Sequence, residues 1–475
     1  MYKKADRAQL SIEEFFLPFG GRLSANNRWV KLARLMPWDL VEDIYAEKFK
    51  NDREDGNVPI PARVAFGALK IKAEEAFTDE RALLFITENP YAQYFLGLRE
   101  FQDKPPFDLS MMVYFRKRFT AEDIAKINEE LYRRTHPPKN DPPSGDDSGE
   151  TPKNKGTLVL DATVAPADIR YPTDLSLLNE CRENLERMID EMSAKHKRKG
   201  RRLACSRKKA RAKYLKVQKQ RKARVSAKKK ACKEQIDYIE KNLETLDTLV
   251  VECGADDLTE RQLQRLEVIE KVLEQQKFHL ANPKKSVPDR IVSLRQPFVR
   301  PIVRGKAGRP TEFGQKLALS IVDGFAFIDA QSFDAFNEGV TLIASAEKYQ
   351  TRHGCWPEAI QADTIYRNRE NRKFCKEHHI RLSGPRLGRP KENEAQAQRE
   401  QACRDSCERN IVESRNGIAK RRYGLDRILA YLEETSQTEA AMAIFAMNAA
   451  GCLWALLRLL FGRVRVVVGC SGGPN

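Results

Sequence analysis

Residues 157–163 read Thr-Leu-Val-Leu-Asp-Ala-Thr, a short run of β-branched and aliphatic residues that carries one carboxylate, Asp161. Such a run predicts a β-strand. Further along the chain, two more strand-type runs predict a hairpin over residues 316–328. Residues 358–363 predict another strand, and this one ends at Asp363. Together with the helices predicted between and after these strands, this pattern indicates an α/β fold with a mixed sheet.

Helices are predicted on both sides of this last strand, over residues 338–353 and 369–378, and residues 291–294 are a possible further strand. Asp161 and Asp363 then fall at strand ends. Catalytic and ligand-binding residues of such sheets tend to lie there.

A third acidic residue, Glu413, lies on a predicted helix between two cations. Arg409 precedes it by four residues and Lys420 follows it by seven, so all three share one helix face. Two aspartates and a glutamate can hold two divalent cations about 4 Å apart, which would clamp the attacking and leaving oxygens of an in-line phosphoryl transfer. The two basic side chains would grip the flanking phosphates. Each acid also has an ordinary alternative: Asp161 as a turn cap, Asp363 as a helix cap, and Glu413 as part of a solvated helix.

Residues 1–136 predict an all-helical region, because helix-periodic stretches are long and β-type alternation is scarce. One of its helices carries Arg116, Lys117 and Arg118 between aromatic residues, which would suit a helix-turn-helix variant that contacts DNA. The segment that follows is rich in Pro, Asp, Ser and Gly and predicts an exposed linker.

The positive charge of the chain is local. Between Met192 and Lys233 there are 20 Lys and Arg residues and no Asp or Glu, and without them the net charge of +17 would be about −3. Apolar residues recur at steps of three and four on both sides of this run, which predicts a helical hairpin over residues 174–285 with a basic middle. A solvated helix face or a disordered tail is the alternative, but an uncompensated basic run favours contact with nucleic acid. The candidate contacts in this run are Arg201, Arg202, Lys228 and Lys229.

Composition narrows the class of protein. The charge of +17 favours a polyanionic partner, and ten cysteines are too sparse for a disulfide scaffold, so we expect a reducing, cytoplasmic compartment. Residues 440–457 are apolar or small except for Asn448, and we interpret them as a buried terminal helix rather than a membrane span. A membrane-associated basic protein is the weaker alternative. The Cys and His spacings fit no common zinc site, and no GxxxxGK motif is present for ATP.

Together these features resemble the bacterial insertion-sequence transposases of the DDE type, in the group with the Arg-x3-Glu-x6-Lys signature, the insertion-sequence family five type. Arg409, Glu413 and Lys420 match that spacing. The chain has Ser406 where the group usually has Tyr, three residues before the Arg. The other blocks that carry the resemblance are Leu160-Asp161-Ala162-Thr163, Ala362-Asp363-Thr364-Ile365-Tyr366, Arg421-Arg422-Tyr423-Gly424-Leu425 and, near the amino end, Phe115-Arg116-Lys117-Arg118.

The resemblance implies an RNase H-like catalytic fold and a metal-dependent nuclease and strand transferase that recognises the terminal inverted repeats of its own element. It implies Asp161, Asp363 and Glu413 as the catalytic and metal-binding triad, with Mg²⁺, or Mn²⁺ in its place, at two ions per active site. Arg409, Arg415 and Lys420 are the DNA contacts expected on the glutamate helix. We expect double-stranded DNA as the partner, both element ends and target, no membrane, a homodimer in the synaptic complex, and a location in the bacterial cytoplasm at the nucleoid.

We therefore predict an RNase H-like α/β domain that is interrupted by a helical insertion and preceded by an all-α domain. The alternative is a non-catalytic, sequence-specific DNA-binding protein derived from a transposase. The predicted ranges are a helical DNA-binding domain at 1–136, a linker at 137–156, the first catalytic segment at 157–174, the basic helical insertion at 175–285, the rest of the catalytic domain at 286–462 and a tail at 463–475.

Overall fold

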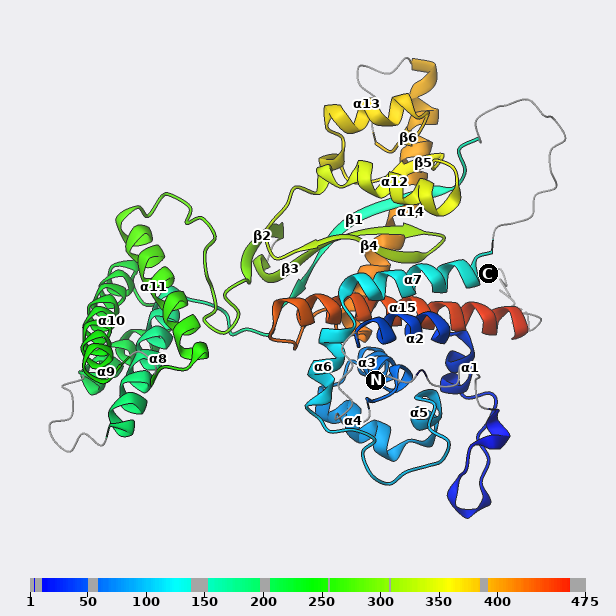
Figure 1. Cartoon of the computed structure of the whole chain (residues 1–475). Helices are drawn as coiled ribbons and strands as arrows, with labels where there is room; N and C mark the ends of the chain where they lie inside the picture. Colours follow the sequence, from blue (N-terminus) through cyan, green and yellow to red (C-terminus); the bar gives the residue numbers. More distant parts are fainter. Residues whose placement is uncertain are drawn as a thin grey trace, which may run out of the picture. The chain divides into compact units, whose positions relative to one another are not determined.

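The computed structural model describes residue 4 and residues 11–49, 59–137, 153–196, 206–254, 257–306, 309–384 and 392–461. The chain divides into two compact units (Figure 1). The first unit combines residues 1–166, 316–332 and 336–475, and the second combines residues 167–315 and 333–335. Arg201 and Arg202, the tail from residue 463 and most of the predicted linker lie outside the described residues.

A mixed sheet runs through the middle of the chain, as predicted. Its strands are β1 (Thr157–Pro166), β2 (Arg300–Lys306), β3 (Arg309–Val322), β4 (Phe325–Ser332), β5 (Ala359–Gln361) and β6 (Arg381–Leu382). The strand order is β2-β3-β1-β5-β6, with β4 also paired to β3. β1, β5 and β6 pair in parallel, whereas β3 pairs antiparallel with β2 and β4.

The predicted hairpin is β3–β4, and two of its local features follow from the backbone. Its turn residues Asp323 and Gly324 both have positive φ, +51° and +79°, which a two-residue hairpin turn requires and which glycine adopts without strain. Further along, Ala318 pairs with Ala330 and Leu319 with Ile328, so Asp329 is an extra residue, a β-bulge.

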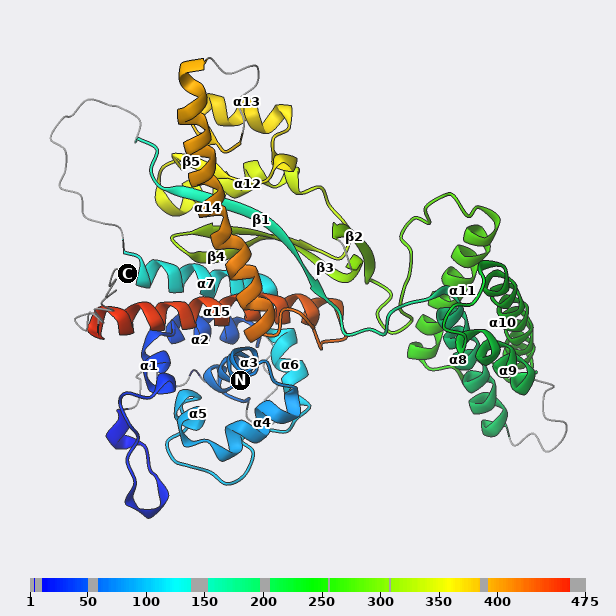
Figure 2. The ribbon, with the colours of Figure 1, turned by 180° about the vertical axis from the view of Figure 1, so that it is seen from behind.

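The helices of the first unit surround the sheet strands with one shared core. They are α1 (Arg28–Leu35), α2 (Trp38–Glu47), α3 (Ala62–Glu74), α4 (Asp79–Glu88), α5 (Pro90–Phe95), α6 (Met111–Arg118), α7 (Ala121–Thr135), α12 (Leu342–His353), α13 (Arg369–Glu377), α14 (Glu392–Arg422) and α15 (Glu433–Phe461), with short 3₁₀ turns at Ile12–Glu14, Pro18–Gly20, Glu338–Val340 and Thr364–Tyr366. α7 and α15 lie side by side against β4 in both views (Figures 1 and 2). Buried apolar residues of the amino-terminal helices, the strands and α15 therefore form one cluster.

The apolar segment at residues 440–457 forms most of α15, and its first half is almost wholly buried, as predicted for a terminal core helix. Asn448 is the one strongly polar residue in it. Its side-chain amide bonds both the N–H and the carbonyl of Ala326 in β4, at 3.0 and 2.7 Å. Among the described residues, no helix combines the length and apolar character that crossing a membrane requires.

The second unit is mainly a helical bundle. It consists of α8 (Asp174–Lys195), α9 (Arg207–Gln218), α10 (Val225–Cys253) and α11 (Glu260–Ala281). The apolar stripes predicted from residue spacing form its core, with Leu178, Leu185, Ile239, Leu246 and Ile269 fully buried. The described part of this region thus forms four helices, where the spacing predicted a helical hairpin.

Two strand assignments differ from the prediction. Residues 291–294 form no strand, although Ile291 and Leu294 are buried in the bundle core. An apolar run indicates burial, but it does not by itself provide a neighbouring strand to pair with. Conversely, β2 was not predicted, because its sequence Arg-Pro-Ile-Val-Arg-Gly-Lys is polar and contains Pro and Gly.

Candidate active site

The two candidate aspartates lie in or just after neighbouring parallel strands. Thr157 of β1 pairs with Ala359 of β5, and Val159 pairs with Gln361, where the pairing ends. Asp161 is the fifth of the ten residues of β1, so the prediction that it ends a strand is wrong. Asp363 lies two residues beyond the end of β5.

Helix α14 crosses this part of the sheet (Figure 2) and supplies the third candidate acid. Polar contacts connect α14 to β6 and to β5. Arg381 of β6 donates to Asp405 at 2.8 and 2.9 Å, and Gln361 of β5 donates to Glu408. Apolar packing completes the attachment, because Val412 and Ala419 are buried in one cluster with Val159 of β1.

Two side chains of α14 contact the aspartates directly. The amide of Asn416 donates to Asp161 at 2.9 Å, and the guanidinium of Arg409 lies 3.6 Å from a carboxylate oxygen of Asp363. Glu413 is on the same stripe of the helix, four residues after Arg409 and three before Asn416. The stripe therefore places Asn416 beside Asp161 and Arg409 beside Asp363, with Glu413 between them along the helix.

Each candidate acid has a distinct environment. Asp161 is partly buried, whereas Asp363 and Glu413 are exposed. Asp363 also accepts a hydrogen bond from the backbone N–H of Thr364 at 2.7 Å, so it caps the short turn Thr364–Tyr366, as its ordinary alternative predicted. Within the described ranges, no three His, Cys, Asp or Glu side chains are close enough together to hold a metal ion. In this structure the two aspartates are therefore paired with protein groups: Asp161 with the amide of Asn416, and Asp363 with the N–H of Thr364 and with Arg409.

A buried tyrosine lies beneath this region. Tyr366 has no exposed surface, and its hydroxyl lies near the side chain of Thr341. Burial, followed by the nearby carboxylates of Glu338 and Asp161, raises the pKa of this hydroxyl well above its usual value. The phenol is therefore neutral. Glu338 itself pairs with Lys316 at 2.9 Å.

The candidate DNA contacts have very different placements. Lys420 is half-buried on the same α14 stripe. Arg415 lies on another side of α14, where its guanidinium packs near Gly324 of the β3–β4 turn and Gly451 of α15. Burial lowers the pKa of this guanidinium. Lys228 and Lys229 are exposed at the start of α10.

Of the three adjacent cations on α6, only Lys117 is exposed. Arg116 is 6% exposed and pairs through two nitrogens with Asp79, at 2.8 and 2.7 Å. Arg118 donates to the hydroxyl of Tyr45 and stacks over Phe49. The predicted DNA role of Arg116 is thus not supported by its position, which is internal to the helical core.

Asn416 is the site residue that sequence reasoning missed. Its position was visible in principle, because steps of four, three and four residues connect Arg409, Glu413, Asn416 and Lys420 along one face. Asparagine carries no charge, however, and nothing in the spacing indicated that it would face Asp161.

Two transposase family models match this chain. The model described as "Transposase DDE domain" matches residues 360–449, and the model described as "Transposase domain (DUF772)" matches residues 18–118. The first range contains Asp363, Glu413 and all of α14, and the second contains α1 to α6. Asp161 and the helical insertion lie outside both ranges. The matches support a transposase.

One curated relative is similar over part of its length. It is "Uncharacterized protein ORF8 in nfe locus" from Rhizobium meliloti, 27% identical over 151 residues, which are 31% of this chain. This chain spans 66% of the length of that relative. No solved structure matches the chain.

Proposed function

We propose that this protein is an insertion-sequence transposase that cuts DNA at the terminal inverted repeats of its element and transfers the freed strand to target DNA. The observation that carries the proposal is the α14 stripe. On this helix, Arg409 lies 3.6 Å from Asp363 and Asn416 donates to Asp161, and Glu413 lies between these two residues in the sequence. The matches to two transposase domain models support the same function.

The residues at the site fit divalent metal ions by their chemistry. Asp161, Asp363 and Glu413 offer only carboxylate oxygens, the ligands that Mg²⁺ and Mn²⁺ prefer. Beside them, the buried side-chain oxygen of Asn416 has no hydrogen-bond partner. When bound, two such ions would activate the attacking oxygen and stabilise the leaving one.

The basic and amide side chains of α14 would bind the DNA and orient the site. Arg409 pairs with Asp363 at 3.6 Å and is 39% exposed, so it can exchange this carboxylate for a phosphate when DNA binds. Lys420, further along the stripe, would contact the next phosphate. Asn416 would hold Asp161 in one orientation through its amide. We propose the helices before residue 136 as a further DNA-binding region, and a homodimer as the form that joins two element ends.

The direct test is cleavage of a labelled duplex that carries the inverted repeats adjacent to the coding region. We expect nicking at the repeat boundary by the wild-type protein with Mg²⁺ or Mn²⁺, and none with EDTA. Glu413→Gln should abolish nicking. Glu400→Gln, at an exposed acid between three and four turns earlier on the same helix, is the matched control and should cut normally. No cleavage by the wild type at any protein concentration would contradict the proposal.

A non-catalytic DNA-binding protein is the second candidate. It is favoured by one observation, the absence of an assembled cluster of three acids in the described residues. Equal and specific binding of the repeat duplex by the wild type and Glu413→Gln, without cutting by either, would support this candidate over the transposase.

A further inference from the structure

The second unit carries a dense group of exposed cations on adjacent helices. We call these residues the basic face. All are exposed, none pairs with an acidic side chain in the part of the chain that the structure describes, and they occupy α9, the turn after it and the first two turns of α10. They are Lys208, Lys209, Arg211, Lys216, Lys219, Arg221, Lys222, Arg224, Lys228, Lys229 and Lys230. Lys213, in the same region, is paired with Glu234 at 3.2 Å.

Helix α9 is destabilised by its own sequence, because like charges at its surface repel each other. Its apolar side is short: Ala210 and Tyr214 are buried against α8 and α10, and Leu215 and Val217 are partly buried against the same core. Polar contacts from the bundle add to this stabilisation.

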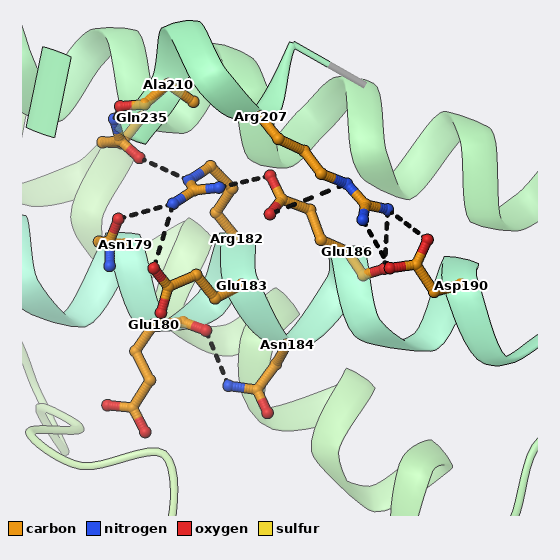
Figure 3. Close-up of polar contacts among 10 residues, drawn as sticks. All are labelled: Asn179, Glu180, Arg182, Glu183, Asn184, Glu186, Asp190, Arg207, Ala210 and Gln235. Carbon is orange, nitrogen blue, oxygen red and sulfur yellow. Dashed lines mark hydrogen bonds and ion pairs between the residues drawn. The ribbon is translucent and has the colours of Figure 1, made fainter. Parts of the chain in front are cut away.

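Those contacts form a buried network centred on Arg182 of α8 (Figure 3). Arg182 is 1% exposed and donates to Asn179 at 2.8 Å, to Glu186, and to Gln235 of α10 at 3.1 Å. Gln235 in turn donates to the carbonyl of Ala210 in α9, at 3.1 Å. One network thus connects all three helices.

A second arm of the network holds the first turn of α9. Arg207 donates to Asp190 through both terminal nitrogens, at 2.5 and 2.8 Å, and to the carbonyl of Glu186 at 3.0 Å (Figure 3). Because Arg207 immediately precedes Lys208 and Lys209, its pairing fixes where these exposed cations begin. Glu186 and Asp190 of α8 thus pair with Arg182 and Arg207, and they do not pair with the cations of the basic face.

We propose that the basic face is a preformed binding surface for the sugar-phosphate backbone of duplex DNA, and that the Arg182–Arg207 network positions it. α9 spans about 18 Å, at about 1.5 Å per residue, which is long enough to reach several phosphates. The inference rests on the proposed DNA-directed function, and it assigns that function a second, sequence-independent contact area on the helical bundle.

The chemistry of the surface favours duplex backbone over other polyanions. Single-stranded nucleic acid is usually held by aromatic side chains on which bases stack, and the single aromatic residue between Ser206 and Lys233, Tyr214, is buried. A membrane-binding helix needs a large apolar side that can enter the lipid, whereas Ala210 and Tyr214 of α9 are already packed in the bundle.

The test measures binding of the full-length protein to a 40-base-pair duplex of random sequence, in EDTA, over a range of salt concentrations. The variant replaces Lys208, Lys209, Arg211, Lys228 and Lys229 by Gln. Each lost phosphate contact should reduce the log-log salt slope by about 0.9, so we expect a reduction of up to about 4.5. The matched control replaces five exposed cations elsewhere in the same unit by Gln and should retain the wild-type slope: Arg187, Lys241, Arg261, Lys271 and Lys284.

A single substitution tests whether the network positions α9 or whether net charge alone determines binding to DNA. Asp190→Asn removes a negative charge, so charge alone predicts tighter binding to DNA. If Asp190 positions α9 through Arg207, binding should instead weaken severalfold. Asp190 is 61% exposed, so the fold should tolerate this change. Tighter binding by Asp190→Asn would overturn the positioning role.

Three outcomes would overturn the surface itself: an unchanged salt slope in the five-site variant, an equal loss in the control, or loss of binding to phosphatidylserine vesicles with duplex binding intact. Failure of the proposed function would look different. In that case the repeat duplex would remain uncut by the wild type in Mg²⁺, while the salt slopes of variant and control could still differ as expected.

Discussion

Asn416 of α14 donates a hydrogen bond to the carboxylate of Asp161, at 2.9 Å. An amide donor to a metal-binding carboxylate fixes which oxygen is free for the ion, and loss of such a partner typically costs 10–100-fold in metal affinity or activity. We therefore predict that Asn416→Ala lowers the cleavage rate by about 10–100-fold. The concentration of Mg²⁺ needed for half-maximal rate should rise as well.

The dependence on Mg²⁺ separates this positioning role from a general loss of structure. Asn410→Ala, at an exposed position on the same helix, is the control and should leave both quantities unchanged. An Asn416→Ala protein with a lower rate but an unaltered Mg²⁺ requirement would show that the contact does not serve the metal site.

Asp329, the bulged residue of β4, predicts a pH dependence of stability. Its side chain is 3% exposed, and burial raises the pKa of its carboxyl, although Ser345, Lys348, Ser320 and Arg352 oppose the shift. The folded state therefore holds this proton more tightly than the unfolded state. The free energy of unfolding should fall as pH rises from the unfolded pKa, about 3.9, through the folded one.

Asp329→Asn removes this titration. We predict that its melting temperature exceeds that of the wild type by an amount that grows from pH 4 to pH 7, by at least about 2 °C, the shift that about 1 kcal/mol produces in a domain of this size. Thermal unfolding at several pH values measures it, with the exposed Asp103→Asn as the control. A gap that stays constant with pH would contradict the prediction.

At the scale of elements, an ionic cluster joins four helices of the first unit. Lys72 of α3 lies 3.1 Å from Asp79 of α4 and 2.6 Å from Glu439 of α15, and Arg116 of α6 pairs with the same Asp79. Removing one partner of a buried pair leaves an uncompensated charge. We predict that Arg116→Ala lowers the free energy of unfolding by about 3–5 kcal/mol.

The neighbouring Lys117→Ala is a natural control, because Lys117 is exposed and its loss should change stability by less than about 0.5 kcal/mol. Denaturant unfolding of both variants measures the two changes in the free energy of unfolding. If Arg116→Ala were as stable as the wild type but bound DNA more weakly, Arg116 would act at the DNA surface after all.

Helices could be predicted from the sequence more reliably than strand pairing or the burial of a single charged side chain. The stripe from Leu178 to Met192 predicted α8 because helical periodicity is a local property. β2 and the run at residues 291–294 were misjudged, because strand pairing depends on a distant partner that no local pattern specifies. Arg116 was misjudged for the same reason: Asp79, 37 residues away, decides whether it is buried or exposed.

At the scale of the molecule, local sequence could not show that the candidate aspartates belong to neighbouring strands. Asp161 and Asp363 are separated in the sequence by the whole helical bundle, and it is the pairing of β1 with β5 that makes their strands neighbours. Nor did the sequence indicate that α3, α6 and α7 would share a core with α15. The shared core places the amino-terminal helices and the candidate site in the same compact unit.

The central claim is that β1, the end of β5 and α14 hold divalent metal together. The most direct test replaces Mg²⁺ by Fe²⁺ in the full-length protein with its repeat duplex, and adds ascorbate and peroxide so that radicals cut the polypeptide near the bound ion. We predict fragments that end near residues 161, 363 and 413, suppressed by excess Mg²⁺ and by Glu413→Gln. Uncut protein, or cuts confined to other segments and unaffected by Glu413→Gln, would contradict the account.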